Sequence, residues 1–241
     1  MNKNNEIRVA ITGFGGLDNS EPGTAVARAL KIGWEGKISI DALGYDPWMT
    51  GAFSPGLIDN IHILPPLSDG DHAVLERIIE INEKRKFHAI IPTLELEISV
   101  LSRLEERLKS KGIKVLVPSY EHINMVTKTL LPYFCYRNKI PTPITLHVPN
   151  VNDVPFHANQ FTYPIMVKGV VASAQKVDNW SDALFYARKF NSRWGGGAIL
   201  QEKIEGEEFD VSIVARNNES CASILAMKKL GINQKGKGVI G

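Results

Sequence analysis

The sequence predicts an α/β protein in which a domain with a doubly wound parallel sheet is followed by an α+β lobe. The first observation is that short β-rich runs alternate with stretches of helical apolar spacing as far as Pro118. Strands that alternate with helices are typical of a parallel sheet covered on both faces. The second observation is that from Phe161 onward the order changes to strand, turn, strand, helix, strand, strand. A domain boundary is therefore expected near residues 119–140.

The first domain is expected to contain five strands and three helices. The β-rich runs predict strands at residues 7–12, 37–43, 61–64, 88–92 and 114–118. Apolar residues at helical spacing predict helices at residues 24–32 and 71–86, and a third around residues 98–108. The apolar face expected for the first of these helices consists of Ala25, Val26, Ala29 and Leu30.

The second part is expected to begin with a helix that runs from Tyr120 to near Ile140. Pro132 should interrupt or kink it, because proline removes a backbone donor from a helix interior. A later helix has two candidate N-caps, Asn179 and Ser181, and three consecutive glycines end it. Strands are expected at residues 163–168, 175–178, 198–200, 209–215 and 223–228.

The composition restricts the possible partners and the compartment. The 241 residues carry a net charge of +2, with 44% hydrophobic and 22% charged residues. This balance does not favour nucleic acid or a membrane as a partner. The N-terminus is polar and lacks the apolar core of a signal peptide. The two cysteines, Cys135 and Cys221, lack metal-ligand spacing, so we expect a cytoplasmic protein with free thiols.

One glycine-rich turn is compatible with a nicotinamide cofactor. The run Gly-Phe-Gly-Gly at residues 13–16 follows the first strand, where dinucleotide folds bind a pyrophosphate. Its sixth position is Asp18, whose carboxylate would repel a phosphate, and the following helix is delayed. Asp41, expected at the tip of the second strand, would be the ribose-binding acid. An oxidoreductase or epimerase is therefore a minor alternative, and a tight turn is the favoured interpretation.

A lysine ends a strand that should be buried. The run Tyr-Pro-Ile-Met-Val-Lys at residues 163–168 delivers Lys168 next to apolar neighbours. A lysine in such a place needs a counter-charge or an anionic ligand, and phosphate is suitable. The small residues at 169–174, including Ser173, could fold over a phosphate chain. On its own, this motif is also compatible with a solvated lysine on an edge strand.

A second motif lies about thirty residues later. The run Gln-Glu-Lys-Ile-Glu-Gly-Glu-Glu at residues 201–208 closes one strand, turns at Gly206 and leads into the next strand at Glu208. By itself this run is typical of a common charged hairpin. It becomes informative because it follows Lys168 at a distance of about thirty residues, with a helix between the two motifs. Lys128, upstream in the expected helix, would by itself be an ordinary solvated lysine.

Taken in order, these pieces resemble the ATP-grasp superfamily, and within it the carbamoyl-phosphate-synthase-like carboxylate–amine ligases. The order is an α/β domain, a linker-helix lysine, Ile-Pro-Thr-Pro at 140–143, the strand ending in Lys168, a small-residue loop, a helix and the 201–208 run. The resemblance implies the following organisation. Residues 1–118 form a pre-ATP-grasp domain, 119–143 a linker helix, 144–204 the small lobe, and 205–241 the start of the C-terminal lobe.

The resemblance also implies roles for individual residues toward ATP. Lys128 and Lys168 would contact the phosphates from two sides, with Ser173 in the lid above them. Backbone groups of Glu202 and Ile204 would hold the adenine edge. The remaining implied contacts are Glu208 to the ribose hydroxyls and Asn233 near the phosphates. No catalytic residue and no metal ligand is assigned.

The sequence departs from the family pattern in two places. The lid loop has only one glycine, Gly169, so fewer of its residues adopt positive φ easily. The acidic residues that hold Mg²⁺ in the family would lie beyond Gly241. We therefore expect a truncated last subdomain, with Mg²⁺ bound only if a missing C-terminal part is present. The chain alone is not expected to be catalytically competent, and its status as an enzyme stays open.

The sequence thus predicts the ATP-binding part of an ATP-dependent carboxylate–amine ligase that acts through an acyl phosphate. The alternative is a non-catalytic nucleotide-binding or scaffold module. Expected partners are ATP and a small carboxylate or amine substrate. The apolar residues of the last strands would lack a covering layer, which predicts self-association or a missing partner segment. These residues are Val211, Ile213, Ile224, Leu225 and Met227.

Overall fold

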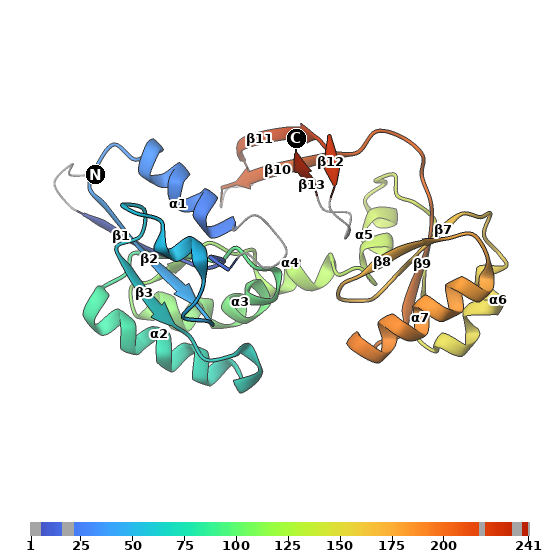
Figure 1. The fold of residues 1–241 in the computed structure, drawn as a ribbon, viewed down its shortest axis with the longest axis horizontal. Helices are drawn as coiled ribbons and strands as arrows, with labels where there is room; N and C mark the ends of the chain where they lie inside the picture. The colour runs from blue at the N-terminus through green and yellow to red at the C-terminus, as the bar shows by residue number, and fades with distance from the viewer. Residues whose placement is uncertain (1–5, 16–21, 217–219, 233–237, 241) are drawn as a thin grey trace. The chain divides into compact units, whose positions relative to one another are not determined.

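The fold is described from a computed structural model of the 241-residue chain, shown in Figure 1. The structure describes residues 6–15, 22–216, 220–232 and 238–240. The chain divides into two compact units, Met1–Ile123 and Asn124–Gly241. Each unit is considered by itself below.

Unit 1 contains the parallel sheet that the sequence predicted. Its strands are β1 (Ile7–Ile11), β2 (Ile38–Gly44), β3 (Asn60–Ile63), β4 (Ala89–Ile91) and β5 (Lys114–Val115). They pair in the order β3-β2-β1-β4-β5, and every pairing is parallel. The helices are α1 (Pro22–Gly33), α2 (Asp71–Arg85) and α3 (Glu95–Ser110), with 3₁₀ turns at Thr50–Phe53 and Leu67–Asp69. The doubly wound fold class is therefore confirmed.

The period-two alternation of the strands sends their side chains into two separate cores. Ala10 and Ile90 pack with residues of α2 and α3 on one face of the sheet. Val9 and Ile11 pack with Ala27 of α1 on the other face. Helices thus cover both faces, as Figure 1 also shows for unit 1. This explains why the strands of unit 1 are nearly continuous apolar runs.

The face that α1 buries agrees with the expected one only in part, because Val26 and Leu30 pack against the core as expected. Gly23 and Ala27 are buried, whereas Ala25 and Ala29 are exposed. The reason lies at Gly23, where a Cβ atom would lie only 2.2 Å from the carbonyl oxygen of Thr12. This close approach of α1 to the end of β1 sets the rotation of the helix about its own axis. Apolar spacing within the helix does not encode that contact.

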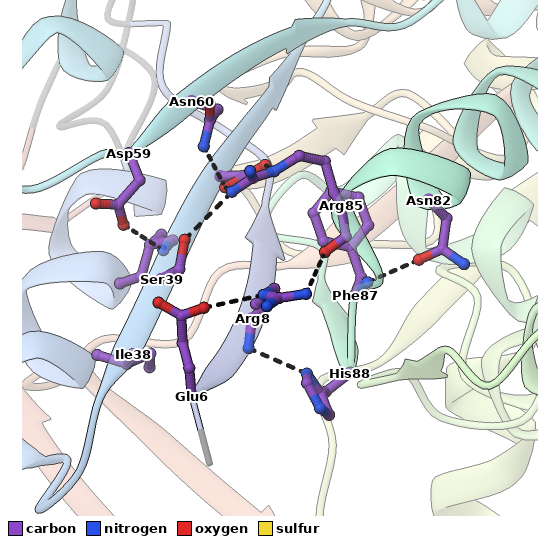
Figure 2. Close-up of polar contacts among 12 residues, drawn as sticks. Glu6, Arg8, Ile38, Ser39, Asp59, Asn60, Asn82, Arg85, Phe87 and His88 are labelled. Atoms are coloured by element: carbon purple, nitrogen blue, oxygen red, sulfur yellow. Dashed lines mark hydrogen bonds and ion pairs between the residues drawn. The ribbon is translucent and has the colours of Figure 1, made fainter. Parts of the chain in front are cut away.

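Asp41 lies in the interior of β2 and not at the strand tip, which corrects the expected position. Its side chain is 1% exposed, and its two oxygens accept hydrogen bonds from Arg85 at 2.7 and 2.9 Å. His62 and Asn60 on β3 also contact this carboxylate, at 2.8 and 3.1 Å. Figure 2 shows Arg85 extending from the end of α2 toward Ser39 on β2. The Asp41 carboxylate is therefore engaged within the fold of unit 1.

A second buried carboxyl group belongs to Glu97 in the first turn of α3, at 1% exposure. It accepts a hydrogen bond from the Thr12 hydroxyl, and its Oε1 atom has no hydrogen-bond partner. Burial raises the pKa of the Glu97 carboxyl above 4.5, although hydrogen bonds from Thr12 and Tyr45 oppose the rise. The folded state of unit 1 therefore favours the protonated form of this group.

This burial predicts how the stability of unit 1 depends on pH. In the unfolded chain Glu97 ionises near 4.5, whereas in the folded chain it ionises at higher pH. The stabilisation is complete below the first value and is lost as the pH rises through the second. Glu97→Gln cannot ionise, so the free energy of unfolding of the wild type minus that of the variant should fall as the pH rises above 4.5. Urea unfolding between acid and neutral pH measures this difference, and a constant or rising difference would contradict it.

Unit 2 contains an antiparallel sheet with helices on one face. Its strands are β6 (Thr145–Val148), β7 (Ile165–Lys168), β8 (Ala174–Val177) and β9 (Ala198–Glu202), in the order β6-β9-β7-β8. A 3₁₀ turn (Val151–Asp153), α6 (Val154–Ala158) and α7 (Trp180–Trp194) accompany them. Asn179 is the N-cap of α7, because its side chain accepts a hydrogen bond from the backbone of Asp182. Between the two candidate caps, the structure therefore selects Asn179.

The single kinked helix expected for residues 120–140 is replaced by two short helices, α4 (Tyr120–Met125) and α5 (Leu131–Arg137). The backbone amides of Leu130 and Leu131 both donate to the carbonyl of Thr127, which closes the turn between the helices. Pro132 lies in the first turn of α5, where its missing N–H has no intrahelical partner to lose. The proline thus begins a helix and does not kink one.

The chain continues with two hairpins, β10 (Phe209–Ala215) with β11 (Cys221–Lys228), and β12 (Gly231–Ile232) with β13 (Gly238–Ile240). All residues of β10 and β11 are exposed. The register places Val211 opposite Ala226 and Ile213 opposite Ile224, so these side chains share one face. Leu225 and Met227 belong to the other face. The expected exposure of the apolar residues in these strands is therefore confirmed.

Candidate functional site

The candidate site lies on the open face of the β6-β9-β7-β8 sheet. Ile165, Val167 and Leu200 point to the opposite face, where they are buried among residues of α6 and α7. Alternation along the strands therefore places Met166 and Lys168 of β7 on the open face. The register adds Gln201 of β9, which pairs with Met166, and Thr145 of β6, which pairs with Gln201. Three strands thus contribute polar side chains to one surface.

Lys168 is partly buried on this face, and its ammonium nitrogen donates to Gln201 Oε1 at 2.6 Å. Desolvation by burial lowers the pKa of Lys168, and the positive charge of Lys128 lowers it further. The carboxylate of Glu208 opposes this shift. The three side chains therefore interact electrostatically, although they come from the turn after α4, the end of β7 and the residue before β10.

Lys128 lies in the turn between α4 and α5, whereas the sequence placed it inside a helix. Its ammonium group donates to the backbone carbonyl of Val171, in the loop that connects β7 and β8. Neither Lys128 nor Lys168 forms an ion pair with a carboxylate among the residues that the structure describes. Two cationic groups thus meet beside this loop with only neutral acceptors.

The small-residue loop at 169–173 is closed on itself. The amide of Gly169 donates to the carbonyl of Ser173 at 3.1 Å, and Trp194 Nε1 donates to Ser173 Oγ at 3.4 Å. A Cβ atom at Gly169 would lie 2.3 Å from the carbonyl oxygen of Ala172, so this position requires glycine. Ser173 adopts a positive φ of 78°, a conformation expected to be scarce in a glycine-poor loop.

The other expected contacts lie at the far end of β9 and beyond it. The backbone amide of Glu202 donates to the carbonyl of Ile144 at 2.9 Å, and Ile204 is 61% exposed after the strand ends. Glu208 forms an exposed ion pair with Lys229 at 2.5 Å. Asn233 lies outside the described residues, so its expected contact has no structural account.

A pocket of about 500 Å³ lies beside the Glu202 end of the sheet and includes Thr145 and Tyr163 in its lining. The hydroxyl of Tyr163 is buried without a hydrogen-bond partner, and burial raises its pKa. Lys168 does not line this pocket. The pocket and the lysine pair are therefore two distinct features of unit 2.

The sequence reasoning missed two residues of the site. Gln201 opens the 201–208 run but received no role, and Thr145 was not singled out. The signal for Gln201 was its position next to a strand end, on a strand expected near Lys168. Thr145 has no comparable local signal, because only the pairing of β6 with β9 brings it to Gln201.

Within residues 6–15, 22–216, 220–232 and 238–240, no group of three or more His, Cys, Asp or Glu side chains is arranged to hold a metal ion. Over the same ranges, no helix combines the length and the apolar character needed to cross a bilayer.

Comparison with known sequences gives no match: no protein-family model and no curated protein matches this chain. Comparison with solved structures does give matches. The biotin carboxylase domain of Hydrogenobacter thermophilus 2-oxoglutarate carboxylase, solved with MgADP, ADP and bicarbonate, superposes with a TM-score of 0.67 at 15% identity. The match covers 96% of this chain and 51% of that one.

Two further solved structures match with similar TM-scores, sequence identities and coverages. The L-amino acid ligase from Bacillus licheniformis superposes with a TM-score of 0.65 at 15% identity, over 92% of this chain and 50% of that one. N5-carboxyaminoimidazole synthetase from Staphylococcus aureus gives 0.63 at 14% identity, over 97% and 58%. These similarities show that the chain shares its fold with part of each of these three proteins. It spans about half the length of the solved structures that it matches.

Proposed function

We propose that this chain is the ATP-binding part of an ATP-dependent carboxylate–amine ligase of the carbamoyl-phosphate-synthase-like kind. The observation that carries the proposal is the pair Lys128 and Lys168, which interact with each other and have only neutral hydrogen-bond acceptors among the described residues. The two ammonium groups repel each other electrostatically, and an anion bound between them would relieve this repulsion. A polyphosphate supplies that anion, with charge-assisted hydrogen bonds to both groups.

The fold similarity supports ATP as the polyphosphate. The matched biotin carboxylase domain was solved with MgADP and ADP, and a structure of the Staphylococcus aureus synthetase was solved with ADP. In the proposed arrangement Lys128 and Lys168 bind the phosphates, and the 169–173 loop with Ser173 lies beside them. Backbone groups of Glu202 and Ile204 hold the adenine edge, and Glu208 accepts from the ribose. Asn233 is proposed as a further phosphate contact.

The proposed reaction begins when a carboxylate attacks the γ-phosphorus of ATP, with ADP as the leaving group. An amine then attacks the carbonyl carbon of the acyl phosphate and releases inorganic phosphate. In this scheme the residues of this chain orient the triphosphate and stabilise its charge. Among the described residues, no group of three or more His, Cys, Asp or Glu side chains is arranged to hold a metal ion. We propose that Mg²⁺ and full catalytic competence need residues outside this chain.

Calorimetric titration with ATP tests the proposal directly. We expect a one-to-one complex with ATP and no binding of NAD at the same concentrations. Binding of NAD with no binding of ATP would overturn the proposal in favour of an oxidoreductase. ATP binding without ADP release, in the presence of candidate carboxylates and amines, fits both an incomplete ligase and the alternative of a non-catalytic nucleotide-binding module. Robust turnover by this chain alone would contradict the proposed need for further residues.

The proposed substrates are a small carboxylate and a small amine, and the proposed compartment is the cytoplasm. Both cysteines are free thiols: Cys135 is buried and Cys221 is exposed. Free thiols are usual in a reducing compartment. Neither nucleic acid nor a membrane is proposed as a partner.

We further propose that the β10–β11 hairpin associates with another copy of the chain. Val211, Ile213 and Ile224 share one exposed face, with exposed fractions of 56%, 61% and 63%. Ile213→Lys should weaken concentration-dependent association and reduce the binding of 8-anilinonaphthalene-sulfonate, because it places a charge in this face. Ser212→Lys, on the opposite face of the same strand, is the matched control. A wild type that is monomeric at all concentrations by light scattering would refute the proposed association.

A further inference from the structure

We propose that Gln201 is a positioning residue that fixes Lys168 through an uncharged relay and leaves the positive charge of Lys168 available to a nucleotide. This inference rests on the proposed ATP binding. It concerns a side chain to which neither the sequence motif nor the comparisons assign a role.

The relay consists of three consecutive hydrogen bonds. Lys168 Nζ donates to Gln201 Oε1 at 2.6 Å, and Gln201 Nε2 donates to Thr145 Oγ1 at 2.8 Å. The Thr145 hydroxyl donates in turn to the carbonyl of Pro143, also at 2.8 Å. The relay therefore links β7, β9 and β6 and ends at the backbone segment that precedes β6.

The direction of this relay fixes the orientation of the Gln201 amide. Because the Thr145 hydroxyl gives its proton to Pro143, its oxygen acts as an acceptor toward Gln201. The NH₂ group of the amide must then face Thr145, which turns Oε1 toward Lys168. A flipped amide would place two donors, the NH₂ group and the ammonium group, against each other. Thr145 thus acts on Lys168 through Gln201.

The acceptor for Lys168 in this relay is neutral, and this has an electrostatic consequence. A carboxylate at position 201 would form an ion pair with Lys168 and cancel most of its field. An amide supplies a hydrogen bond and geometry without cancelling the charge. The two lysines then keep a combined positive charge, which a triphosphate neutralises on binding.

Two charged groups act on the pH dependence of Lys168, and two further titratable groups share its face of the sheet. Lys128 and Glu208 act on its pKa in opposite directions. Lys176 of β8 pairs with Met166, and His147 of β6 pairs with Ile199, so both lie on the same face of the sheet. His147 bonds to the carbonyl of Gly196 at 2.7 Å. In the wild type, loss of the Lys168 proton should weaken ATP binding at alkaline pH, and burial and Lys128 move this limit below the ordinary lysine range.

The first test compares Gln201→Glu with the wild type by ATP titration across a pH series. The new carboxylate should weaken ATP binding about tenfold or more at neutral pH, since it neutralises one of the two cations. It should also move the alkaline limit of binding to higher pH, because an adjacent negative charge raises the pKa of a lysine. Gln175→Glu is the matched control: Gln175 pairs with Val167 on the opposite face, and its variant should bind within about twofold of the wild type.

The second test acts on the relay from its far end. Thr145→Val removes the acceptor that orients the amide and should weaken ATP binding several-fold, whereas Thr145→Ser keeps the hydroxyl and should restore wild-type affinity. Thermal unfolding of each variant without ATP identifies any loss of the fold. If the wild type fails to bind ATP, the proposed function itself is wrong. If the wild type binds ATP but Gln201→Glu leaves both the affinity and the alkaline limit unchanged, only the role of Gln201 is overturned.

Discussion

Replacing Lys168 with alanine is expected to weaken ATP binding by about 10- to 150-fold, because one charge-assisted hydrogen bond to a phosphate contributes roughly 1.5–3 kcal/mol. The ammonium group lies partly buried on the open face of its sheet and bonds to a neutral amide. Lys128, the other cation of the pair, donates to the carbonyl of Val171. The dissociation constant of the ATP complex, measured by calorimetry, reports the effect.

The matched control for this substitution is Lys189→Ala. Lys189 is an exposed residue of α7, the helix that packs on the other face of the same sheet. Its removal deletes the same charge from unit 2 without touching the candidate site, so ATP affinity should remain within about twofold. If Lys168→Ala and Lys189→Ala bind ATP equally well, the proposed phosphate site is wrong, whatever the affinity of the wild type.

The second large effect concerns stability: Asp41→Ala should destabilise unit 1 by about 3 kcal/mol, because it leaves the Arg85 guanidinium without its buried partner. Asp41 is 1% exposed and binds Arg85 through both oxygens, with His62 and Asn60 as further partners. The expected loss lies at the low end for a buried pair, since the Arg85 side chain is 28% exposed and can reach water. Urea unfolding followed by circular dichroism measures it.

Glu80→Ala provides the comparison for this result. Glu80 also pairs with an arginine of α2, Arg77, at 2.6 Å, but its carboxylate is 61% exposed. Exposed ion pairs of this kind contribute little to stability, so we expect a much smaller loss for Glu80→Ala than for Asp41→Ala. Equal losses for Asp41→Ala and Glu80→Ala would show that burial does not govern the strength of the Asp41 contacts. A larger loss of stability for Asp41→Ala than for Glu80→Ala would support a structural role for Asp41. It would not be expected from the alternative role of Asp41 as the acid that binds the ribose of a nicotinamide cofactor.

Local patterns in the sequence predicted most of the fold. The alternation of β-rich runs with helical spacing predicted the parallel sheet of unit 1 and its helices, and the structure confirms this class. The sequence offered two candidate N-caps for α7, and in the structure Asn179 is the residue that caps the helix. The order of motifs along the chain predicted an ATP-grasp protein, and the chain shares its fold with a biotin carboxylase domain, an L-amino acid ligase and N5-carboxyaminoimidazole synthetase. The roles assigned to individual residues toward ATP stay predictions.

Other features depend on contacts between segments that are distant in sequence. The helix expected across Lys128 ends at Met125, because backbone contacts within the next turn replace helical ones. Asp41 looked like a free residue at a strand tip, whereas its partner Arg85 is 44 residues away in sequence. The rotation of α1 follows from the close approach of Gly23 to the end of β1. The sequence immediately around Lys128, Asp41 or Gly23 does not indicate which distant segment each of these residues contacts.

The sequence by itself determined most of the segments that become strands and helices, because side-chain periodicity and turn chemistry act within a few residues. It also determined which lysines are candidates for phosphate. Only the tertiary structure decided what surrounds those lysines: the carbonyl of Val171 for Lys128, and the relay through Gln201 and Thr145 for Lys168. Gln201 and Thr145 are 56 residues apart, and strand register brings them together. A shift of one residue would turn each side chain to the other face, so the site depends on how the strands pair.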